Sequence, residues 1–378
     1  MFQLTEDQLS LRDLVREFAE GVLEPRAEEY DKENKYPEEA VLGLAEMGVM
    51  GLNIPEQYSG TEMDEICKVI AVEEVGRCCA ATGEILATQL LVNDLILKNA
   101  NEAQMQRYLP MIAEGKLGAF ALTEPGAGSD ASALRTRAVK DGDGYILNGT
   151  KCFISNLGPN EGEFAFVIAV TDPEKGSRGG MTAFLVDRGQ FSVGKTEDKM
   201  GIRGAAVSEL ILDDSRVPES AVVGKVGDGF RIAMSGLDDG RIGMAALSVG
   251  ISQRAIEAAI KYSKERVQFK KLISEQQGLR WYIAEMATRL QAARLLTYDA
   301  AAARVNKDPE LVIKASMAKY YASEVATFVT DLAVQIHGGY GYMRDYVVER
   351  LYRDARILRI FEGTSEIQKI VISREMLK

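Results

Sequence analysis

Apolar residues recur with the helical period of about 3.6 through the first part of the chain. In the first predicted helix they stand at i, i+3, i+4 and i+7, namely at Leu11, Leu14, Val15 and Phe18. The segment Thr5–Gln8 precedes them and has the pattern of a capping box, in which two side chains satisfy the free amides of a helix start. Segments Glu65–Arg77 and Ile85–Asn99 continue the helical pattern, so we predict an N-terminal α-helical domain over residues 1–115.

The period shifts towards two between Leu117 and Val223, which is typical of strands. Two strands are expected within Gly144–Ser155, joined by a turn at Asn148-Gly149, because this dipeptide is a strong hairpin signal. Further strands are expected at Phe164–Val170, Met181–Val186 and Glu209–Leu212. We therefore predict a middle β domain over residues 116–225.

Helical patterning returns after Gly229 and runs almost to Lys378, with an interruption at Gly338–Gly341. This predicts a C-terminal α-helical domain over residues 226–378. The order is α, then β, then α, without alternation of strands and helices. That order argues against a doubly wound fold and favours an α+β protein of several domains.

Composition narrows the classes of function. The 378 residues are 46% apolar and 27% charged, which is ordinary for a folded protein. Because 45 Lys and Arg face 56 Asp and Glu, the net charge is -11, and a nucleic-acid partner is not expected. His337 is the single histidine, which excludes a centre built from several histidines, and we predict no metal site.

The cysteines and the N-terminal segment indicate the cellular compartment in which the protein is expected. Cys67, Cys78, Cys79 and Cys152 form no C-x-x-C pair, which favours free thiols in a reducing environment. The charged N-terminal segment lacks the apolar stretch of a secretory signal. No uninterrupted apolar run approaches about 20 residues. We expect a soluble, cytoplasmic, bacterial protein without membrane insertion.

The segment Gly126–Ala131 matches G-x-G-x-x-A, a fingerprint of dinucleotide binding. The fingerprint needs a strand before it and a helix after it, whereas a strand-like stretch follows here. A nicotinamide-binding βαβ unit is therefore not expected. A glycine-rich loop that offers backbone N–H groups to a phosphate stays open.

Glu362 lies between an apolar pair and Gly363. Apolar neighbours raise the pKa of a carboxyl group, which suits a general base. Taken alone, the local sequence favours the alternative, an acid that caps a helix before Gly363. In the same way, Asp238–Arg241 is either a solvated turn or a ligand clamp. His337, beside two glycines, is expected to have a structural role.

Taken together, these signals resemble the acyl-CoA dehydrogenase family along the whole chain, most strongly its bacterial short-chain (butyryl-CoA) branch. The segments that carry the resemblance are Leu122–Asp130, Asn148–Asn156, Glu265–Phe269, Gln335–Tyr342, Tyr352–Ala355 and Phe361–Gln368. The resemblance implies an N-terminal α-helical domain, a middle β-barrel-like or sandwich domain and a C-terminal four-helix bundle.

The resemblance also implies that FAD binds between the β domain and the C-terminal helices, without a Rossmann fold. It assigns to the cofactor, around the flavin and its pyrophosphate, Leu122, Thr123, Gly128, Ser129, Phe153, Ser155, Thr364 and Glu366. It places the adenosine end across a subunit interface, within a homotetramer that is a dimer of dimers, on Arg266, Gln268, Phe269, Gln277, Gln335 and Gly339. Lys270 stands where the family usually has Gly.

In the family, Glu362 falls on the position of the catalytic base. The base removes the α proton of an acyl-CoA, a hydride leaves the β carbon for flavin N5, and a trans-2-enoyl-CoA forms. Electrons are exchanged with an electron-transferring flavoprotein. The resemblance assigns substrate contacts to Ser129, Asp238, Arg241 and Gly363. The alternatives are the reverse reaction of an enoyl-CoA reductase, an acyl-CoA oxidase-like activity and a non-catalytic homologue that binds flavin or CoA.

Glu84 lies in the segment Ala80–Gln89, from which family members line the far end of the acyl pocket, commonly with apolar residues. An acid is costly to bury there without a partner. One interpretation is that Glu84 points away or pairs with Lys or Arg, which leaves a butyryl-type pocket. The other is that Glu84 contacts the substrate and binds a polar or cationic acyl tail.

Overall fold

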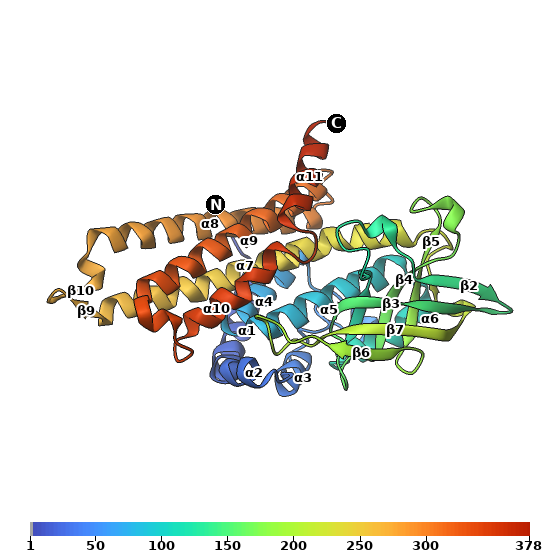
Figure 1. Cartoon of the computed structure of the whole chain (residues 1–378), viewed down its shortest axis with the longest axis horizontal. Coiled ribbons are helices and arrows are strands. Elements are labelled where there is room, and N and C mark those ends of the chain that lie inside the picture. The colour runs from blue at the N-terminus through green and yellow to red at the C-terminus, as the bar shows by residue number, and fades with distance from the viewer. Residues whose placement is uncertain (1–2) are drawn as a thin grey trace.

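The computed structural model describes residues 3–378, and the chain runs from helices to a sheet and back to helices (Figure 1). The N-terminal helices are α1 (Glu6–Phe18), α2 (Ala27–Glu33), α3 (Glu38–Glu46), α4 (Glu65–Cys78), α5 (Ala80–Asn99) and α6 (Glu102–Ala113). The C-terminal helices are α7 (Gly229–Glu265), α8 (Gln277–Val305), α9 (Leu311–His337), α10 (Val347–Ala355) and α11 (Ser365–Met376). The predicted α+β order is confirmed, while the domain boundaries stay predictions.

The capping box at the start of α1 is confirmed. Thr5 Oγ1 accepts from the Gln8 amide at 3.2 Å, and Gln8 Oε1 accepts from the Thr5 amide at 3.1 Å. Leu11 and Val15 are buried, but Leu14 is 50% exposed, so the apolar face of α1 is narrower than its sequence suggested. Helix α5 is long and apolar enough to cross a membrane, yet 94% of its most apolar window is buried inside the protein. In this structure α5 is a core helix.

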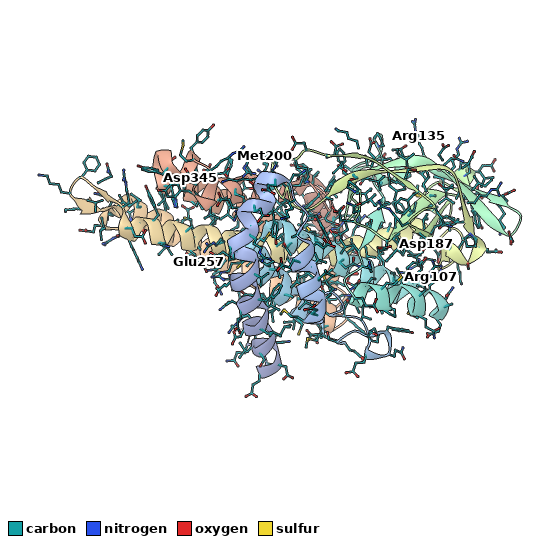
Figure 2. All side chains as sticks on the ribbon, turned by 90° about the horizontal axis from the view of Figure 1, so that it is seen from below. Arg107, Arg135, Asp187, Met200, Glu257 and Asp345 are labelled. Carbon is teal, nitrogen blue, oxygen red and sulfur yellow. The ribbon has the colours of Figure 1, made fainter. Side chains whose placement is uncertain are left out.

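The sheet contains β1 (Gly118–Ala121), β2 (Arg137–Asp141), β3 (Gly144–Ser155), β4 (Phe164–Val170), β5 (Met181–Asp187), β6 (Ser192–Thr196), β7 (Val207–Pro218) and β8 (Val222–Val223). The order is β6-β7-β3-β2-β4-β5-β8, and β1 pairs in parallel with β4. Strands β1, β2 and β6 were not expected from the sequence. Helix α6 lies beside the sheet, where Arg107 and Asp187 meet at 2.6 Å (Figure 2).

The hairpin predicted at Asn148-Gly149 is wrong, because β3 runs unbroken through both residues. Strand β7 pairs with β3 on either side of Asn148. The register shifts there because Asp213 and Asp214 of β7 together oppose Asn148 alone, so the bulge lies in β7 and β3 continues through the dipeptide. Asn148 and Asp214 exchange two hydrogen bonds across the bulge, at 3.1 and 2.9 Å. Long-range pairing with β7 therefore overrides the local turn signal. The chain turns instead between β2 and β3, at Gly142.

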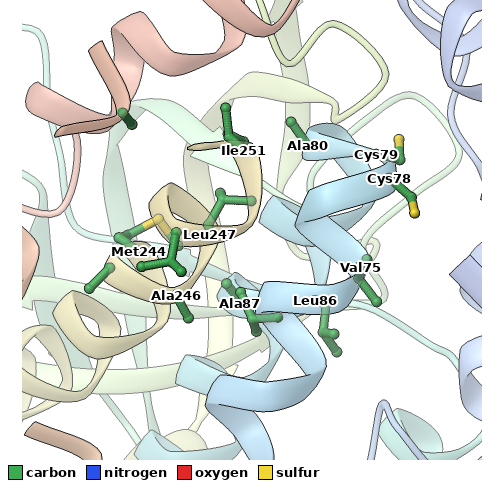
Figure 3. Close-up of a cluster of buried hydrophobic side chains, with 14 of the residues drawn as sticks. Val75, Cys78, Cys79, Ala80, Leu86, Ala87, Met244, Ala246, Leu247 and Ile251 are labelled. Atoms are coloured by element: carbon green, nitrogen blue, oxygen red, sulfur yellow. The ribbon is translucent and has the colours of Figure 1, made fainter. Parts of the chain in front are cut away.

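The contact between α4, α5 and α7 positions the site described below. Figure 3 shows the apolar side chains of this interface, including Leu247 of α7 opposite the α4–α5 pair. At Gly83 a Cβ would lie 2.8 Å from Leu247 Cδ1 and from the Gly76 backbone, so glycine is needed for this close approach. Cys78 and Cys79 lie here, and all four cysteines are buried and free, as predicted.

Helix α9 packs against α7 and α8, and α10 and α11 pack against α9. The predicted interruption at Gly338–Gly341 is confirmed as a 3₁₀ helix over Gly338–Tyr342. The sequence pattern did not reveal a second interruption, the short hairpin of β9 (Val267–Gln268) and β10 (Lys271–Leu272). Figure 1 shows this hairpin at the end of the molecule opposite to the sheet.

Candidate active site

Glu362 lies in a tight turn immediately before α11. Its backbone is left-handed, with φ of 53°, and Gly363 follows with φ of 88°. Thr364 caps the helix, since its hydroxyl oxygen accepts from the Ile367 amide at 3.3 Å. The cap is thus Thr364, and the alternative in which Glu362 caps the helix is wrong. A left-handed glutamate costs free energy and must be held by its surroundings.

Two buried side chains hold this turn. Lys319 of α9 donates through Nζ to the Gly363 carbonyl at 2.6 Å. Gln368 of α11 donates through Nε2 to the carbonyls of Glu362 and Gly363, at 3.1 and 2.9 Å. Sequence reasoning missed both residues. The available signal was a lysine on the alanine-rich buried stripe of α9, beside Ala315, Ala318 and Ala322.

The Glu362 carboxyl group is shielded and unsatisfied. Its Oε2 is buried and makes no hydrogen bond within residues 3–378. Burial raises the pKa of Glu362 to about 7. The positive charges of Lys319 and Arg241 oppose this rise of the pKa, and the negative charge of Glu84 adds to it. A carboxyl group that titrates near neutral pH and has a bare oxygen is suited to accept a proton.

Asp238–Arg241 is neither a solvated turn nor a loop, because it lies inside the long helix α7. Arg241 donates through Nη1 to Asp238 at 2.5 Å, while its buried Nε makes no hydrogen bond within residues 3–378. Asp239 is held by Lys98 and by Arg304. At Gly240, a Cβ would lie 2.8 Å from Glu362 Oε2. Glycine therefore lets the helix backbone approach the bare carboxyl oxygen.

A loop from β1 meets β3 on the sheet side. Lys151 is completely buried and donates through Nζ to the Leu122 carbonyl at 3.0 Å and to Glu124 at 2.8 Å. The Thr123 carbonyl accepts from the Cys152 amide at 2.9 Å. These bonds fix the backbone at Leu122 and Thr123 beside Phe153–Ser155. Lys151 was not singled out from the sequence as a site residue.

The glycine-rich segment Gly126–Ala131 forms a tight loop, in which Glu124 and Ala127 exchange backbone hydrogen bonds. A three-residue 3₁₀ helix and then β2 follow, so the segment is not part of a βαβ unit, as expected. Gly128 and Ser129 are exposed. A Cβ on Gly128 would meet nothing within 4 Å, so the backbone is accessible to a ligand.

A second group of assigned residues surrounds a cavity of about 510 Å³ at the far end of the helices. Arg266, Gln268 and Gly339 line it, and the Arg266 guanidinium lies 5.3 Å from the centre of the Tyr340 ring. His337 also lines it and stacks on Tyr262 at 4.2 Å. The other assigned residues at this end are exposed: Phe269 in the hairpin, Gln277 at the start of α8 and Gln335 in the last turn of α9.

Three family models cover almost the whole chain. They describe the N-terminal, middle and C-terminal domains of acyl-CoA dehydrogenases and match residues 5–116, 119–215 and 227–377. The chain belongs to the acyl-CoA dehydrogenase family. As a member it is a flavoprotein oxidoreductase that uses FAD and acts on CH–CH bonds of acyl-CoA.

Three relatives illustrate the breadth of this acyl-CoA dehydrogenase family. An acryloyl-CoA reductase (NADH) of Anaerotignum propionicum is 49% identical over 100% of this chain and 96% of its own. Butyryl-CoA dehydrogenase of Megasphaera elsdenii superposes with a TM-score of 0.97 at 41% identity, covering 100% of both chains. A chain of a structure described as the electron transferring flavoprotein of Acidaminococcus fermentans also has a TM-score of 0.97, at 45% identity and with 100% of both chains covered.

The exposed surface between sheet and helices fits a flavin. Phe153 has a left-handed backbone, with φ of 57°, and its side chain is 64% exposed beside partly exposed Ser155. Thr123 is likewise only partly buried, and the loop at Gly128 is open. Asn156 Oδ1 is buried without a hydrogen bond in the described part of the chain. An exposed ring, accessible backbone and an unsatisfied polar atom are what an acyl-CoA dehydrogenase needs at its cofactor.

The two groups of cofactor residues are far apart in one acyl-CoA dehydrogenase chain. Helix α7 connects Gly240, beside Glu362, to Arg266 at its C-terminal end. At about 1.5 Å per residue, this part of the helix is about 39 Å long. Glu362 and the residues around Arg266 therefore lie towards opposite ends of α7 in one chain.

Glu84 of α5 is 3% exposed. It lies near enough to Glu362 for its negative charge to raise the pKa of the Glu362 carboxyl group. Thr88 donates to Oε1 of Glu84 at 3.1 Å, whereas Oε2 makes no hydrogen bond within residues 3–378. No Lys or Arg nitrogen in this range lies within 4 Å of its carboxyl group. The ion pair with Lys or Arg, one of the possibilities stated for Glu84, is therefore not found within residues 3–378. Burial raises the pKa of Glu84.

Proposed function

We propose that the enzyme interconverts a short-chain acyl-CoA and its trans-2-enoyl-CoA, with Glu362 as the base that takes the α proton. The observation that supports this is the buried, unpaired Oε2 of Glu362, which faces the α7 backbone at Gly240. The α C–H of a thioester is a very weak acid. A desolvated carboxylate is a stronger base than one in water, so burial serves this step.

The backbone at Glu362 supports the same step. Its amide N–H makes no hydrogen bond within residues 3–378, so it is free to donate to the thioester oxygen. That oxygen becomes more negative as the α proton leaves, and a fixed donor stabilises this charge. Lys319 and Gln368 hold the turn from the carbonyl side and so orient both the N–H and the carboxyl group.

FAD, when bound, accepts the hydride that leaves the β carbon. We assign the flavin end to Leu122, Thr123, Gly128, Ser129, Phe153, Ser155, Thr364 and Glu366. Asp238, Arg241, Ser129 and Gly363 are proposed to contact the acyl-CoA. The bare Arg241 Nε supports this, because a buried guanidinium with a free donor suits an anionic or carbonyl-rich ligand.

A homotetramer, built as a dimer of dimers, is the proposed assembly. In it, a second copy supplies the adenosine end of the cofactor site through Arg266, Gln268, Phe269, Gln277, Gln335 and Gly339. The separation of about 39 Å along α7 supports a site shared between copies. Exposure of Phe269, at 89%, also supports an interface at the hairpin, since a large apolar side chain is stabilised by being covered.

An electron-transferring flavoprotein is the proposed redox partner, and the cytoplasm is the proposed location. The similarity to a chain from an electron transferring flavoprotein structure supports the partner. Buried, free cysteines support a reducing compartment. The similarity to an acryloyl-CoA reductase favours, as a second candidate, net reduction of a short enoyl-CoA by the same residues.

The test is anaerobic addition of butyryl-CoA to the FAD-loaded protein, followed by the visible flavin spectrum. We expect the flavin absorbance to bleach in the wild type and to persist in Glu362→Gln, which should still bind the ligand. Crotonyl-CoA added to the chemically reduced enzyme tests the reverse direction. Bleaching of Glu362→Gln at the wild-type rate contradicts the assignment of the base.

A further inference from the structure

The buried acids of this protein are generally paired, and Glu84 is not. Glu73 binds Arg294 at 2.9 Å, Asp94 binds Lys68 at 2.5 Å and Glu124 binds Lys151 at 2.8 Å. Glu84 is as buried as these residues, but its neighbouring donors are the hydroxyls of Thr88, at 3.1 Å from Oε1, and of Ser155, and its Oε2 is without a hydrogen bond in residues 3–378. An ionised carboxylate accepts up to about four hydrogen bonds, and Glu84 has no ion pair within this range to supply the rest.

Nearby groups show which space Glu84 faces. Ser155 of β3 and the Lys199 ammonium both favour its charged form, and its own charge acts on Glu362. Lys199 does not reach it, because that ammonium donates to the carbonyls of Ala205, at 2.8 Å, and Arg203. Asn156, directly after β3, donates through Nδ2 to the Ile85 carbonyl at 3.2 Å, so the part of α5 that carries Glu84 lies at the end of β3. Glu84 therefore faces the region between α5, β3 and the Glu362 turn. The proposed function puts the reacting α carbon at Glu362, so the acyl chain extends into this region.

We propose that Glu84 binds a positively charged amino group at the end of the acyl chain, so that the preferred substrates are short ω-aminoacyl-CoA thioesters. The inference rests on the proposed function, because it takes the acyl chain to lie beside Glu362. An ammonium supplies the counter-charge and the hydrogen-bond donor that Oε2 of Glu84 lacks. An alkyl chain leaves this carboxyl unpaired in an apolar setting, and a chain ending in a carboxylate adds like charge.

The inference can be tested by measuring ligand binding alone, without the oxidation reaction. The ligands are S-(5-aminopentyl)-CoA and its isostere S-hexyl-CoA, two stable thioethers that cannot be oxidised as thioesters are, titrated calorimetrically into the FAD-loaded protein. We expect the amine to bind at least 10-fold tighter to the wild type. Glu84→Gln should reduce the ratio of the two dissociation constants to about 1, and Glu84→Leu should reverse it. Ile96→Val, a buried change on the same helix, should keep the wild-type ratio.

Equal binding of the two thioethers, or tighter binding of S-hexyl-CoA by the wild type, overturns the inference. So does a ratio that Glu84→Gln and Glu84→Leu leave unchanged. Flavin content and thermal melting establish that each variant is folded, and the glutamine variant keeps the side-chain shape if the leucine variant is unstable.

Turnover separates this inference from the proposed function. Anaerobic bleaching by hexanoyl-CoA and by freshly prepared 5-aminopentanoyl-CoA reports the chemistry. If neither thioester bleaches the flavin while the thioether preference depends on Glu84, the proposed function fails and the cation site stands. If hexanoyl-CoA bleaches the flavin and no preference for the amine exists, the proposed function stands and the cation site fails.

Discussion

Replacement of Glu362 by Gln should make the enzyme less active but more stable at alkaline pH. The folded protein raises the pKa of this carboxyl from 4.5 to about 7. The folded state therefore binds the proton more tightly than the unfolded state, and ionisation of Glu362 destabilises the fold as the pH rises. This penalty is small at low pH, grows between pH 4.5 and 7, and is complete above pH 7.

The magnitude follows from the two pKa values of Glu362. Ionisation costs the wild type less than about 1 kcal/mol of unfolding free energy at pH 5 and about 3 kcal/mol at pH 8. Gln has no charge to bury. The difference in unfolding free energy between Glu362→Gln and wild type should thus move by about 2 kcal/mol in favour of the variant from pH 5 to pH 8. For a chain of this length, that corresponds to a shift in Tm of about 3 °C.

The assay is thermal melting of the FAD-loaded wild type, Glu362→Gln and the exposed control Glu17→Gln at both pH values. The control should follow the wild type. The reasoning is refuted if the gap in Tm between Glu362→Gln and wild type does not widen with pH, or if it narrows.

The pH dependence of activity should report the same titration of Glu362. Proton abstraction needs the ionised carboxylate, so the rate of bleaching by butyryl-CoA should be about one tenth of its maximum at pH 6 and half-maximal near pH 7. Reduction of an enoyl-CoA needs the protonated acid and should decline above pH 7. Glu362→Gln should lose about 10²-fold or more in rate in both directions.

Three further changes probe the site. Gly240→Ala places a Cβ 2.8 Å from Glu362 Oε2 and should slow bleaching at least about 10-fold without loss of flavin; unchanged single-turnover kinetics contradict this. Lys151→Met leaves Glu124 buried without its cation and should destabilise the protein by about 3–5 kcal/mol, seen as a lower Tm and weaker flavin retention, whereas an unaltered Tm opposes it. Arg266→Ala should lower FAD content and dissociate the oligomer in sedimentation; wild-type values for both contradict the shared site.

Local sequence determined the order of the elements and several of their ends. The capping box at Thr5–Gln8 needs residues four positions or fewer apart, so the sequence alone specifies it. The spacing of apolar residues likewise depends only on which face of one helix or strand is buried. It predicted the bounds of α4, β4 and β5 closely. The recurrence of family motifs along the chain added the candidate base, Glu362, and the cofactor.

The tertiary structure decided the features that depend on distant neighbours. Asn148-Gly149 became part of a continuous strand, opposite a bulge in β7, because β7 pairs with β3 on both sides of Asn148. Asp238–Arg241 lies in a helix because α7 continues through it against α5 and α9. The Glu362 turn is held by Lys319 of α9, whose partner Gly363 lies 44 residues further along the chain.

The burial of Glu84 was also decided by the tertiary structure. Nothing in the pattern around Glu84 indicates whether a cation lies within reach, because a partner can come from any part of the chain. The packing of α5 against α7 and α4 buried this carboxyl and left one oxygen bare. Periodicity is encoded over a few residues, whereas the desolvation that tunes an acid and the contacts that satisfy it arise when the elements pack together.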